Sequence, residues 1–171
     1  MFFTSTNKIN ITLCGMMGSG KSIIGRRLSK KIDFGFIDTD NLIEQKSGKT
    51  INQIFSEDGE DYFRKLEEQL ITKALKNKNY VISLGGGAII NKKIRNIILE
   101  KSYNIYLQVG IDVLAKRLSN SKKRPLLINK NIKKTLKDLL ERRKKFYNSA
   151  DLILKNEINI DKVVIKIIER L

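Results

Sequence analysis

The chain has 171 residues, with 34 Lys or Arg against 18 Asp or Glu, and its formal net charge is +16 at pH 7. It contains one Cys and no His, which excludes a disulfide framework, a zinc cluster and any catalytic triad that needs imidazole. A chain of this length fits one domain, residues 1–171, with a core of its own.

The stretch MFFTSTNKIN at the N-terminus lacks the long apolar segment of a signal peptide, and nowhere do about 18 apolar residues follow one another. We therefore expect a cytoplasmic protein with no membrane partner. Separately, we expect the protein to be a monomer. The single cysteine, Cys14, ends a predicted strand, where we expect a buried and unreactive thiol.

The stretch GMMGSGKS, residues 15–22, has the G-x-x-x-x-G-K-[ST] spacing of a phosphate-binding loop. A strand is predicted before it over Ile9–Cys14 and a helix after it over Ser22–Ile32. Glycines let backbone N–H groups converge on phosphate oxygens, Lys21 would reach the β- and γ-phosphates, and the Ser22 hydroxyl would bind Mg²⁺. We expect an ATP site formed by Gly15, Gly18, Ser19, Gly20, Lys21 and Ser22.

The next predicted strand, Phe34–Asp38, ends in the sequence DTD. Because no apolar strand elsewhere ends in the Asp of a Walker B motif, Asp38 is the candidate for holding Mg²⁺. Asp40 follows in the first turn of the next helix, where it can accept hydrogen bonds from substrate hydroxyls or cap the helix. The spacing leaves both roles of Asp40 open.

A helical region is predicted from Asp40 to about Asn77. Gly48 is expected to end its first helix, Thr50 to begin a second with a capping-box pattern, and Gly59–Asp61 to begin a third.

In the third helix, an apolar stripe formed by Phe63, Leu66, Leu70 and Ala74 predicts that Phe63 lies in the core. Arg64 lies beside that stripe in the first turns, where a cation gains nothing from the helix dipole. We therefore expect an anionic partner for Arg64, and the candidates within the chain at helical spacing are Glu60, Glu67 and Glu68.

A buried strand over Tyr80–Leu84 runs into GGGA, Gly85–Ala88. Three consecutive glycines indicate a backbone that passes against a ligand, or a tight turn. The later elements are predicted as helices over 91–102, 111–120, 132–149 and from 160, and as strands over 104–109 and 152–155. Five β-α units predict an α/β fold, with a five-stranded parallel sheet flanked by helices on both faces and ligands at the carboxyl ends of the strands.

The positive charge allows a second interpretation, because SKKR and NKNIKK within Ser121–Lys134 resemble the basic patch of a nucleic-acid-binding protein. However, Lys recurs in every segment, and neither a nucleic-acid-binding motif nor interleaved aromatic residues accompany these runs. We therefore expect no nucleic-acid partner. Attraction of anionic small substrates explains part of the charge.

The motifs GMMGSGKS, FIDTDNLIE, IFSEDGEDYFR, LGGGA and RPLL, in this order and at these spacings, resemble those of the shikimate kinase family from the first strand to the end of the chain. The resemblance implies a P-loop fold like that of nucleoside monophosphate kinases, with a mobile lid. It also implies that ATP and shikimate are the partners, and that the γ-phosphoryl group moves, with Mg²⁺, to the 3-hydroxyl of shikimate on the route to chorismate and aromatic amino acids. A gluconate or nucleotide kinase shares the fold but should lack the combination of DTD, GExxFR and GGGA.

The resemblance also implies roles for individual residues. Asp40 would hold the shikimate hydroxyls and deprotonate or orient the 3-hydroxyl, while Arg64 and Arg143 would bind the carboxylate. The substrate would lie in a region that includes residues 39–66, and the residues expected around it are Asp40, Phe55, Phe63, Arg64, Gly85, Gly86, Gly87 and Arg143.

The family usually has Pro two residues after the carboxylate-binding Arg, where this chain has Lys145, and this leaves Arg142 as the alternative to Arg143. Arg117 would stack on adenine, and Asn156 is the candidate in the adenine-contacting loop. Arg124 would close over the phosphates as part of a lid at about residues 118–130. The catalytic residues implied are Lys21, Asp40 and Arg124.

Overall fold

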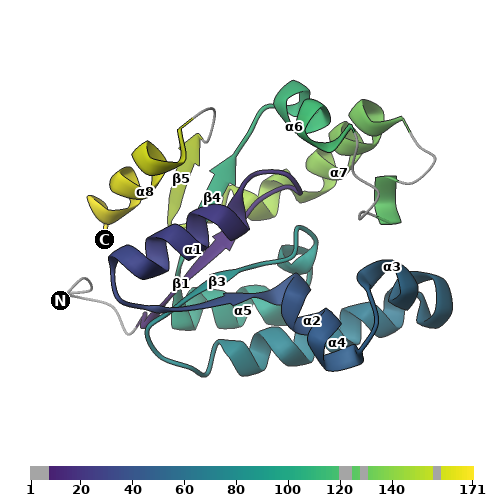
Figure 1. The fold of residues 1–171 in the computed structure, drawn as a ribbon, viewed down its shortest axis with the longest axis horizontal. Coiled ribbons are helices and arrows are strands. Elements are labelled where there is room, and N and C mark those ends of the chain that lie inside the picture. The colour runs from purple at the N-terminus through teal and green to yellow at the C-terminus, as the bar shows by residue number, and fades with distance from the viewer. Residues whose placement is uncertain (1–7, 120–124, 128–130, 156–158) are drawn as a thin grey trace.

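The computed structural model describes residues 8–119, 125–127, 131–155 and 159–171. Its centre is a five-stranded parallel sheet with the strand order β2-β3-β1-β4-β5 (Figure 1). The strands are β1 (Asn10–Cys14), β2 (Gly35–Asp38), β3 (Tyr80–Ser83), β4 (Ser102–Gln108) and β5 (Leu152–Lys155). This arrangement confirms the predicted α/β fold.

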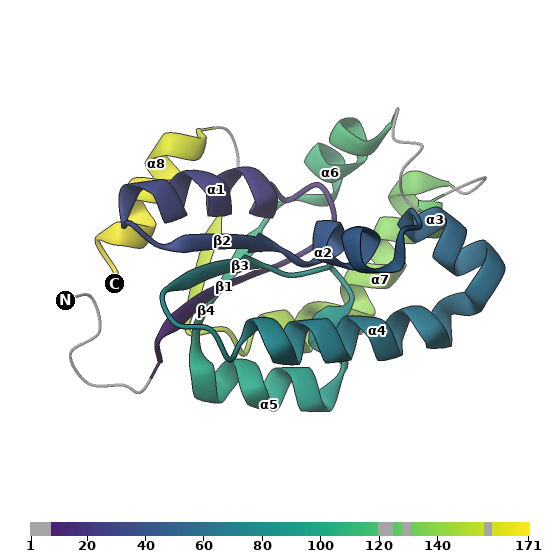
Figure 2. The same ribbon diagram turned by 60° about the horizontal axis from the view of Figure 1, so that its bottom comes forward.

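Helices cover both faces of the sheet. The α-helices are α1 (Lys21–Lys31), α2 (Thr39–Ser47), α3 (Ile51–Gln53), α4 (Gly59–Ala74), α5 (Lys92–Lys101), α6 (Ile111–Leu118), α7 (Ile132–Tyr147) and α8 (Ile160–Ile168). Shorter helical turns are η1 (Ile54–Asp58, a π-helix), η2 (Ala88–Ile90) and η3 (Pro125–Leu127), the last two being 3₁₀-helices. Figure 2 shows α1 and α8 on one side of the strands and α4 and α5 on the other.

All five residues of β1 are buried, as expected of a central strand covered on both faces. Its alternate side chains enter two separate cores. Ile11 and Leu13 pack with α1 and α8, whereas Cys14 packs with residues of α4, α5 and α7. Burial raises the pKa of the Cys14 thiol to about 12, which agrees with the expected unreactive thiol.

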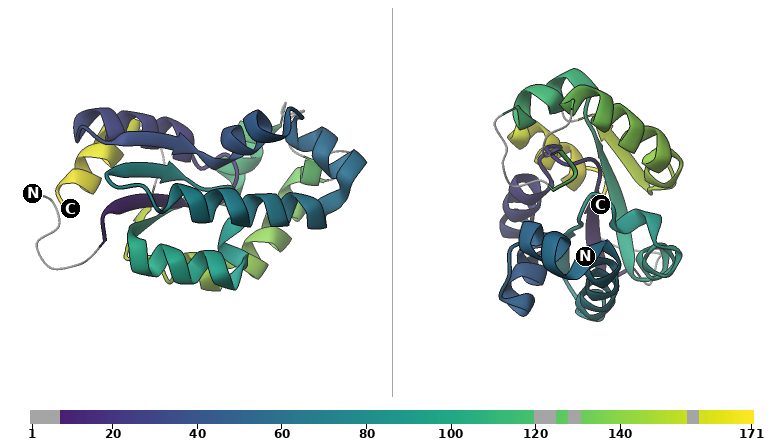
Figure 3. Two further views of the ribbon diagram at one scale, coloured as in Figure 1. Left: turned by 90° about the horizontal axis from the view of Figure 1, so that it is seen from below. Right: turned by 90° about the vertical axis from the view of Figure 1, so that its right-hand side faces the viewer.

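The local signals in the helical region are confirmed by the structure. Gly48 ends α2 with a left-handed backbone at φ 69°, and Thr50 forms a capping box with Gln53. The π-helix η1 between α3 and α4 was not predicted. Figure 3 shows α2, α3 and the start of α4 at the end of the molecule opposite the C-terminus.

The register of the sheet brings two predicted motifs together, because Asp38 at the end of β2 pairs with Ser83 at the end of β3. Thr39, directly after β2, accepts a hydrogen bond at its Oγ1 from the Gly85 N–H at 2.9 Å. DTD and GGGA therefore lie side by side at the carboxyl edge of the sheet. None of the helices over the described residues is long and apolar enough to traverse a bilayer.

Candidate active site

The phosphate loop connects the central strand β1 to α1. At Gly15, φ is 138° and a Cβ would lie 2.7 Å from the Leu107 carbonyl oxygen, so only glycine fits there. The Lys21 ammonium donates to the carbonyl oxygens of Gly15 and Met16, each at 3.0 Å. Gly20 precedes α1 with φ 90° and gives no side-chain cap, so the N–H groups of the first turn are left for a ligand.

A pocket of about 240 Å³ opens above this helix terminus. Lys21, Ser22, Asp38, Asp40 and Gly86 are among its lining residues. The Ser22 hydroxyl donates to Asp38 Oδ2 at 2.5 Å, which places two hard oxygen groups together at the phosphate loop. We call this space the phosphate pocket.

Asp38, not Asp40, caps α2. Its Oδ1 accepts hydrogen bonds from the N–H groups of Asp40 at 3.1 Å and Asn41 at 3.3 Å. The alternative that Asp40 serves as the helix cap is therefore wrong, because Asp40 lies inside the first turn of α2 and its side chain faces the pockets.

A second pocket adjoins the first, and we call it the acceptor pocket. It is lined by Met17, Asp40, Ile51, Phe55, Phe63, Arg64, Glu67, Gly85, Gly86, Gly87, Leu126 and Arg143. Phe55 comes from the π-helix η1, and its ring lies 4.9 Å from that of Phe63 at an angle of 48°. Every substrate residue expected from the sequence thus lies around one space.

Arg64 has two carboxylate partners from its own helix. Its Nη1 donates to Glu67 Oε2 at 2.6 Å, and its Nη2 donates to Glu60 Oε1 at 3.0 Å. The expected anionic partner of Arg64 is therefore present within the chain. Because α4 is fixed by its apolar face, these two carboxylates hold the guanidinium at the wall of the pocket.

Glu67 is 1 % exposed, which is exceptional for a carboxyl group. Burial raises its pKa, while the charge of Arg64 opposes that shift. Its Oε1 atom has no hydrogen-bond partner among the described residues. Glu67 lies on the buried face of α4 at the position between Phe63 and Leu70, so an acid within an apolar stripe was the signal that could have identified it as a pocket residue.

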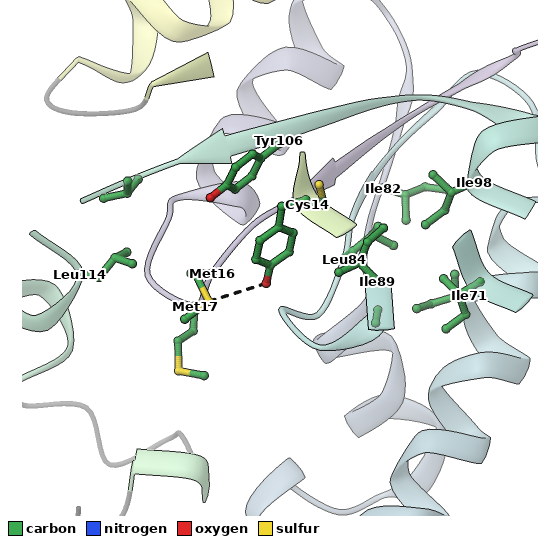
Figure 4. Close-up of a cluster of buried hydrophobic side chains, with 14 of the residues drawn as sticks. Cys14, Met16, Met17, Ile71, Ile82, Leu84, Ile89, Ile98, Tyr106 and Leu114 are labelled. Atoms are coloured by element: carbon green, nitrogen blue, oxygen red, sulfur yellow. Dashed lines mark hydrogen bonds between the residues drawn. The ribbon is translucent and has the colours of Figure 1, made fainter. Parts of the chain in front are cut away.

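Arg143 is 3 % exposed and lines the acceptor pocket, whereas Arg142 is exposed and lies outside it. Among the described residues, neither Nε nor Nη1 of Arg143 has a hydrogen-bond partner. One turn further along α7, the Tyr147 hydroxyl donates to the Gly86 carbonyl at 2.5 Å and lies 3.8 Å from the Met16 sulfur. The dashed line that begins at Met16 in Figure 4 marks the second contact. Tyr147 thereby joins α7 to both the glycine run and the phosphate loop.

The glycine run brings the backbone into contact with charged side chains. A Cβ on Gly85 would lie 2.8 Å from both Asp40 Oδ1 and Glu67 Oε1, and one on Gly87 would lie 2.8 Å from the Arg64 guanidinium. Side chains at these two positions would displace the charged groups. The run therefore fits the expectation of a backbone that passes close to a ligand site.

The remaining predicted residues are only partly placed. Arg117 on α6 donates from Nη1 to the Gly18 carbonyl at 2.9 Å, so it lies against the phosphate loop. Arg124 and Asn156 lie outside the described residues. The lid predicted at about 118–130 is described only at 118–119 and 125–127. Within that part, Leu126 reaches the acceptor pocket, a contact that the sequence did not indicate.

A parallel sheet with a phosphate loop after its central strand, and a second pocket beside the phosphate pocket, define a P-loop kinase. The shikimate kinase family model matches residues 17–171. Shikimate kinase of Mannheimia succiniciproducens is 44 % identical over 149 residues, covering 86 % of this chain and 85 % of the relative, and that of Zymomonas mobilis is 41 % identical over 142 residues, covering 83 % and 81 %. The chain belongs to the shikimate kinase family.

Solved structures agree with this assignment. The structure of shikimate kinase from Acinetobacter baumannii in complex with shikimate is similar with a TM-score of 0.92 and 32 % identity, covering 95 % of this chain and 92 % of that one. A gluconokinase from Sinorhizobium meliloti is similar with a TM-score of 0.60 and 14 % identity, covering 97 % and 93 %. The second likeness shows only that the two proteins share a fold.

Proposed function

We infer that this protein transfers the γ-phosphoryl group of ATP to the 3-hydroxyl of shikimate, giving shikimate 3-phosphate and ADP. The observation that carries this inference is that Asp40 and Gly86 line both the phosphate pocket and the acceptor pocket. An acceptor hydroxyl held at Asp40 is therefore at the boundary with the phosphate loop. Phosphoryl transfer depends mainly on such positioning and on charge stabilisation.

Asp40 is proposed to accept a hydrogen bond from the acceptor hydroxyl and to orient or deprotonate it. Because Asp38 makes the cap of α2, the carboxylate of Asp40 is not needed for capping. It stands in the first turn of α2, beside Gly85 of the glycine run. A carboxylate placed in this way contributes typically about 10²- to 10⁴-fold as a general base.

Arg64 and Arg143 are proposed to bind the carboxylate of shikimate. They face the acceptor pocket from α4 and α7, and a planar guanidinium matches a carboxylate with two hydrogen bonds. Arg143 lacks a carboxylate partner at Nε and Nη1 among the described residues, so its charge is available to a ligand. Phe55 and Phe63 would pack against the apolar part of the ring.

Ser22 and Asp38 are proposed to hold Mg²⁺. Their oxygens are 2.5 Å apart beside Lys21 in the phosphate pocket, and such hard oxygen groups suit Mg²⁺, which takes most of its ligands from water and phosphates. When bound, the ion would neutralise charge on the β- and γ-phosphates. Lys21 is proposed to reach those phosphates from the first turn of α1, and Arg124 to close over them.

An assay of ADP release tests the function, with shikimate, gluconate, AMP and single-stranded DNA offered separately. Of the four acceptors, only shikimate should give ADP, and the amount of ADP should equal the amount of shikimate 3-phosphate formed. Turnover with only gluconate or AMP would overturn the acceptor assignment. Binding of DNA with steep salt dependence, and no need for ATP, would instead support the nucleic-acid interpretation.

A further inference from the structure

A third cavity lies on the α7 side of the sheet, beyond the two pockets described above. Its volume is about 350 Å³, and none of its lining residues lines the phosphate pocket or the acceptor pocket. The volume is within the range of small-molecule sites in proteins, about 300–1,000 Å³. Nothing in the proposed phosphoryl transfer uses it.

The floor of the cavity is formed by β4 and the edge strand β5. Tyr106 and Gln108 alternate along β4, and Gln108 is paired in register with Lys155 of β5, so all three lie on one face of the sheet. Lys155 therefore stands at the rim beside Gln108. Val109, in the loop from β4 to α6, and Ile111, the first residue of α6, add an apolar wall.

The roof comes from α7. Leu140 and Lys144 are four residues apart and line the cavity, and Tyr147, three residues further, stacks on Tyr106 at 4.9 Å and 17°. Lys144 thus occupies a position on the same stripe of α7 as Leu140 and Tyr147. Lys144 is exposed, so it supplies a positive charge at the mouth of the cavity.

Tyr106 adds a hydroxyl from the floor of the cavity. The residue is 2 % exposed and lines the cavity, and no hydrogen bond joins its hydroxyl to another residue in the part of the chain that the structure describes. Figure 4 shows this hydroxyl pointing away from Cys14, and burial raises its pKa, so it keeps its proton and can donate.

Two lysines, a tyrosine hydroxyl and an amide face apolar walls here, and no Asp or Glu of the described chain lines the cavity. We propose that this cavity binds a small organic carboxylate with an apolar body. The carboxylate would accept hydrogen bonds from Tyr106, Lys144 and Lys155, and its apolar body would lie against Val109, Ile111 and Leu140.

The test uses benzoate as the probe, benzamide as its neutral analogue, and amide NMR on the full chain. Benzoate is expected to cause saturable shifts of the amide signals of Gln108 and Gly110. Benzamide should bind at least about 10-fold more weakly than benzoate. A hydrogen bond to a charged group contributes roughly tenfold or more to affinity. The double variant with Lys144→Gln and Lys155→Gln should therefore bind benzoate at least about 10-fold more weakly. Tyr106→Phe, which keeps the ring and its stacking, should weaken it about 3- to 10-fold.

Lys145→Gln is the matched control, because Lys145 is also on α7 but lies over the Phe146 ring, outside the cavity. It should leave benzoate binding unchanged. The proposal is overturned if benzoate does not bind, if it shifts only Gly86 and Gly87 in the acceptor pocket, or if benzamide binds equally well. It is also overturned if the double lysine variant binds benzoate like the unmodified chain.

Discussion

The phosphate pocket and the acceptor pocket share Asp40 and Gly86 but are built in different ways. In the phosphate pocket, the phosphate loop and the start of α1 supply two glycines, the Lys21 ammonium and the Ser22 hydroxyl, and residues at the ends of β2 and β3 complete the wall. The acceptor pocket is built from side chains of α2, η1, α4 and α7 together with the glycine run after β3. The first pocket is centred on one local structure, whereas the second is assembled from segments that are distant in the chain.

The two pockets also differ in how their charges are held. Lys21 is fixed by two carbonyl oxygens of its own loop, whereas Arg64 is fixed by carboxylates of its own helix and faces a buried acid and a buried arginine. We therefore expect changes at the boundary or in the phosphate pocket to reduce the rate of transfer. Changes in the acceptor pocket should first reduce shikimate binding.

The largest effect is expected for Asp40→Asn at the boundary. The variant keeps the size of the side chain, and Asp38 still caps α2, so the fold should survive. Loss of the negative charge should lower kcat about 10²- to 10⁴-fold while shikimate still binds. Steady-state kinetics beside calorimetry with shikimate measure the two effects. Asp61→Asn, an exposed first-turn acid of α4, is the control, and normal kcat in Asp40→Asn would remove Asp40 from the mechanism.

Lys21→Ala should have the next largest effect. It removes the ammonium beside the phosphate loop, and loss of one such charge-stabilising donor typically costs about 10² to 10³ in kcat. ATP binding should weaken, but the affinity for shikimate alone should not change, because Lys21 does not line the acceptor pocket. Lys30 is exposed in the last turn of the same helix, so Lys30→Ala should leave kcat and ATP binding unchanged. A Lys21→Ala variant with weaker shikimate binding and unchanged kcat would contradict the division between the pockets.

The same contrast explains which parts could be predicted from the sequence. The phosphate loop, Gly48 and the Thr50 capping box depend on neighbours within a few residues, so their spacing was sufficient. The sequence left open whether Asp40 caps α2, because two acids two residues apart give the same local signal, and it did not identify Asp38 as the cap. Only the structure shows that the N–H groups of Asp40 and Asn41 donate to the carboxylate of Asp38.

Tertiary contacts account for what the sequence did not indicate. Glu67 appeared only as one of three possible ion-pair partners of Arg64. Its burial depends on how α4 packs against α2 and on the glycine run beside its carboxylate. Leu126 reaches the acceptor pocket from η3, a segment between α6 and α7. The π-helix that positions Phe55 follows from the connection of α3 to α4 rather than from any single residue. Burial and long-range proximity have no local sequence signal.

Arg64→Ala should weaken shikimate binding more than it lowers kcat. The shikimate carboxylate would lose one guanidinium, a loss on the order of 1.5 to 3 kcal/mol or roughly 10- to 150-fold in affinity. Glu67 would also lose its 2.6 Å ion pair, so unfolding in urea should be measured alongside calorimetry. Lys65→Ala changes the exposed neighbour and should bind normally. Unchanged shikimate affinity in folded Arg64→Ala would mean that Arg143 alone binds the carboxylate.

The smallest effect on shikimate binding is expected for Glu67→Gln. Its effect on the free energy of unfolding should change with pH. Burial raises the folded-state pKa of Glu67 above its ordinary value of 4.5, so the native chain binds this proton more tightly than the unfolded chain. The stability contributed by the protonated carboxyl is fully present below 4.5 and is lost as pH rises through the raised pKa. Gln cannot titrate, so this part of the pH dependence should vanish in the variant.

The unmodified protein and Glu67→Gln are unfolded in urea at a series of pH values from 4 upward. The difference between their free energies of unfolding isolates the contribution of Glu67, because the other carboxyl groups contribute equally to both proteins. The free energy of unfolding of the unmodified chain should fall relative to Glu67→Gln as pH rises. Shikimate affinity should drop less than in Arg64→Ala, since Arg64 keeps Glu60 at 3.0 Å. Glu68→Gln, a partly exposed acid whose pKa is lowered by Asn91 and Lys93, should give the opposite pH trend. A relative stability that rises with pH in the Glu67 comparison would show that the Arg64 ion pair outweighs burial.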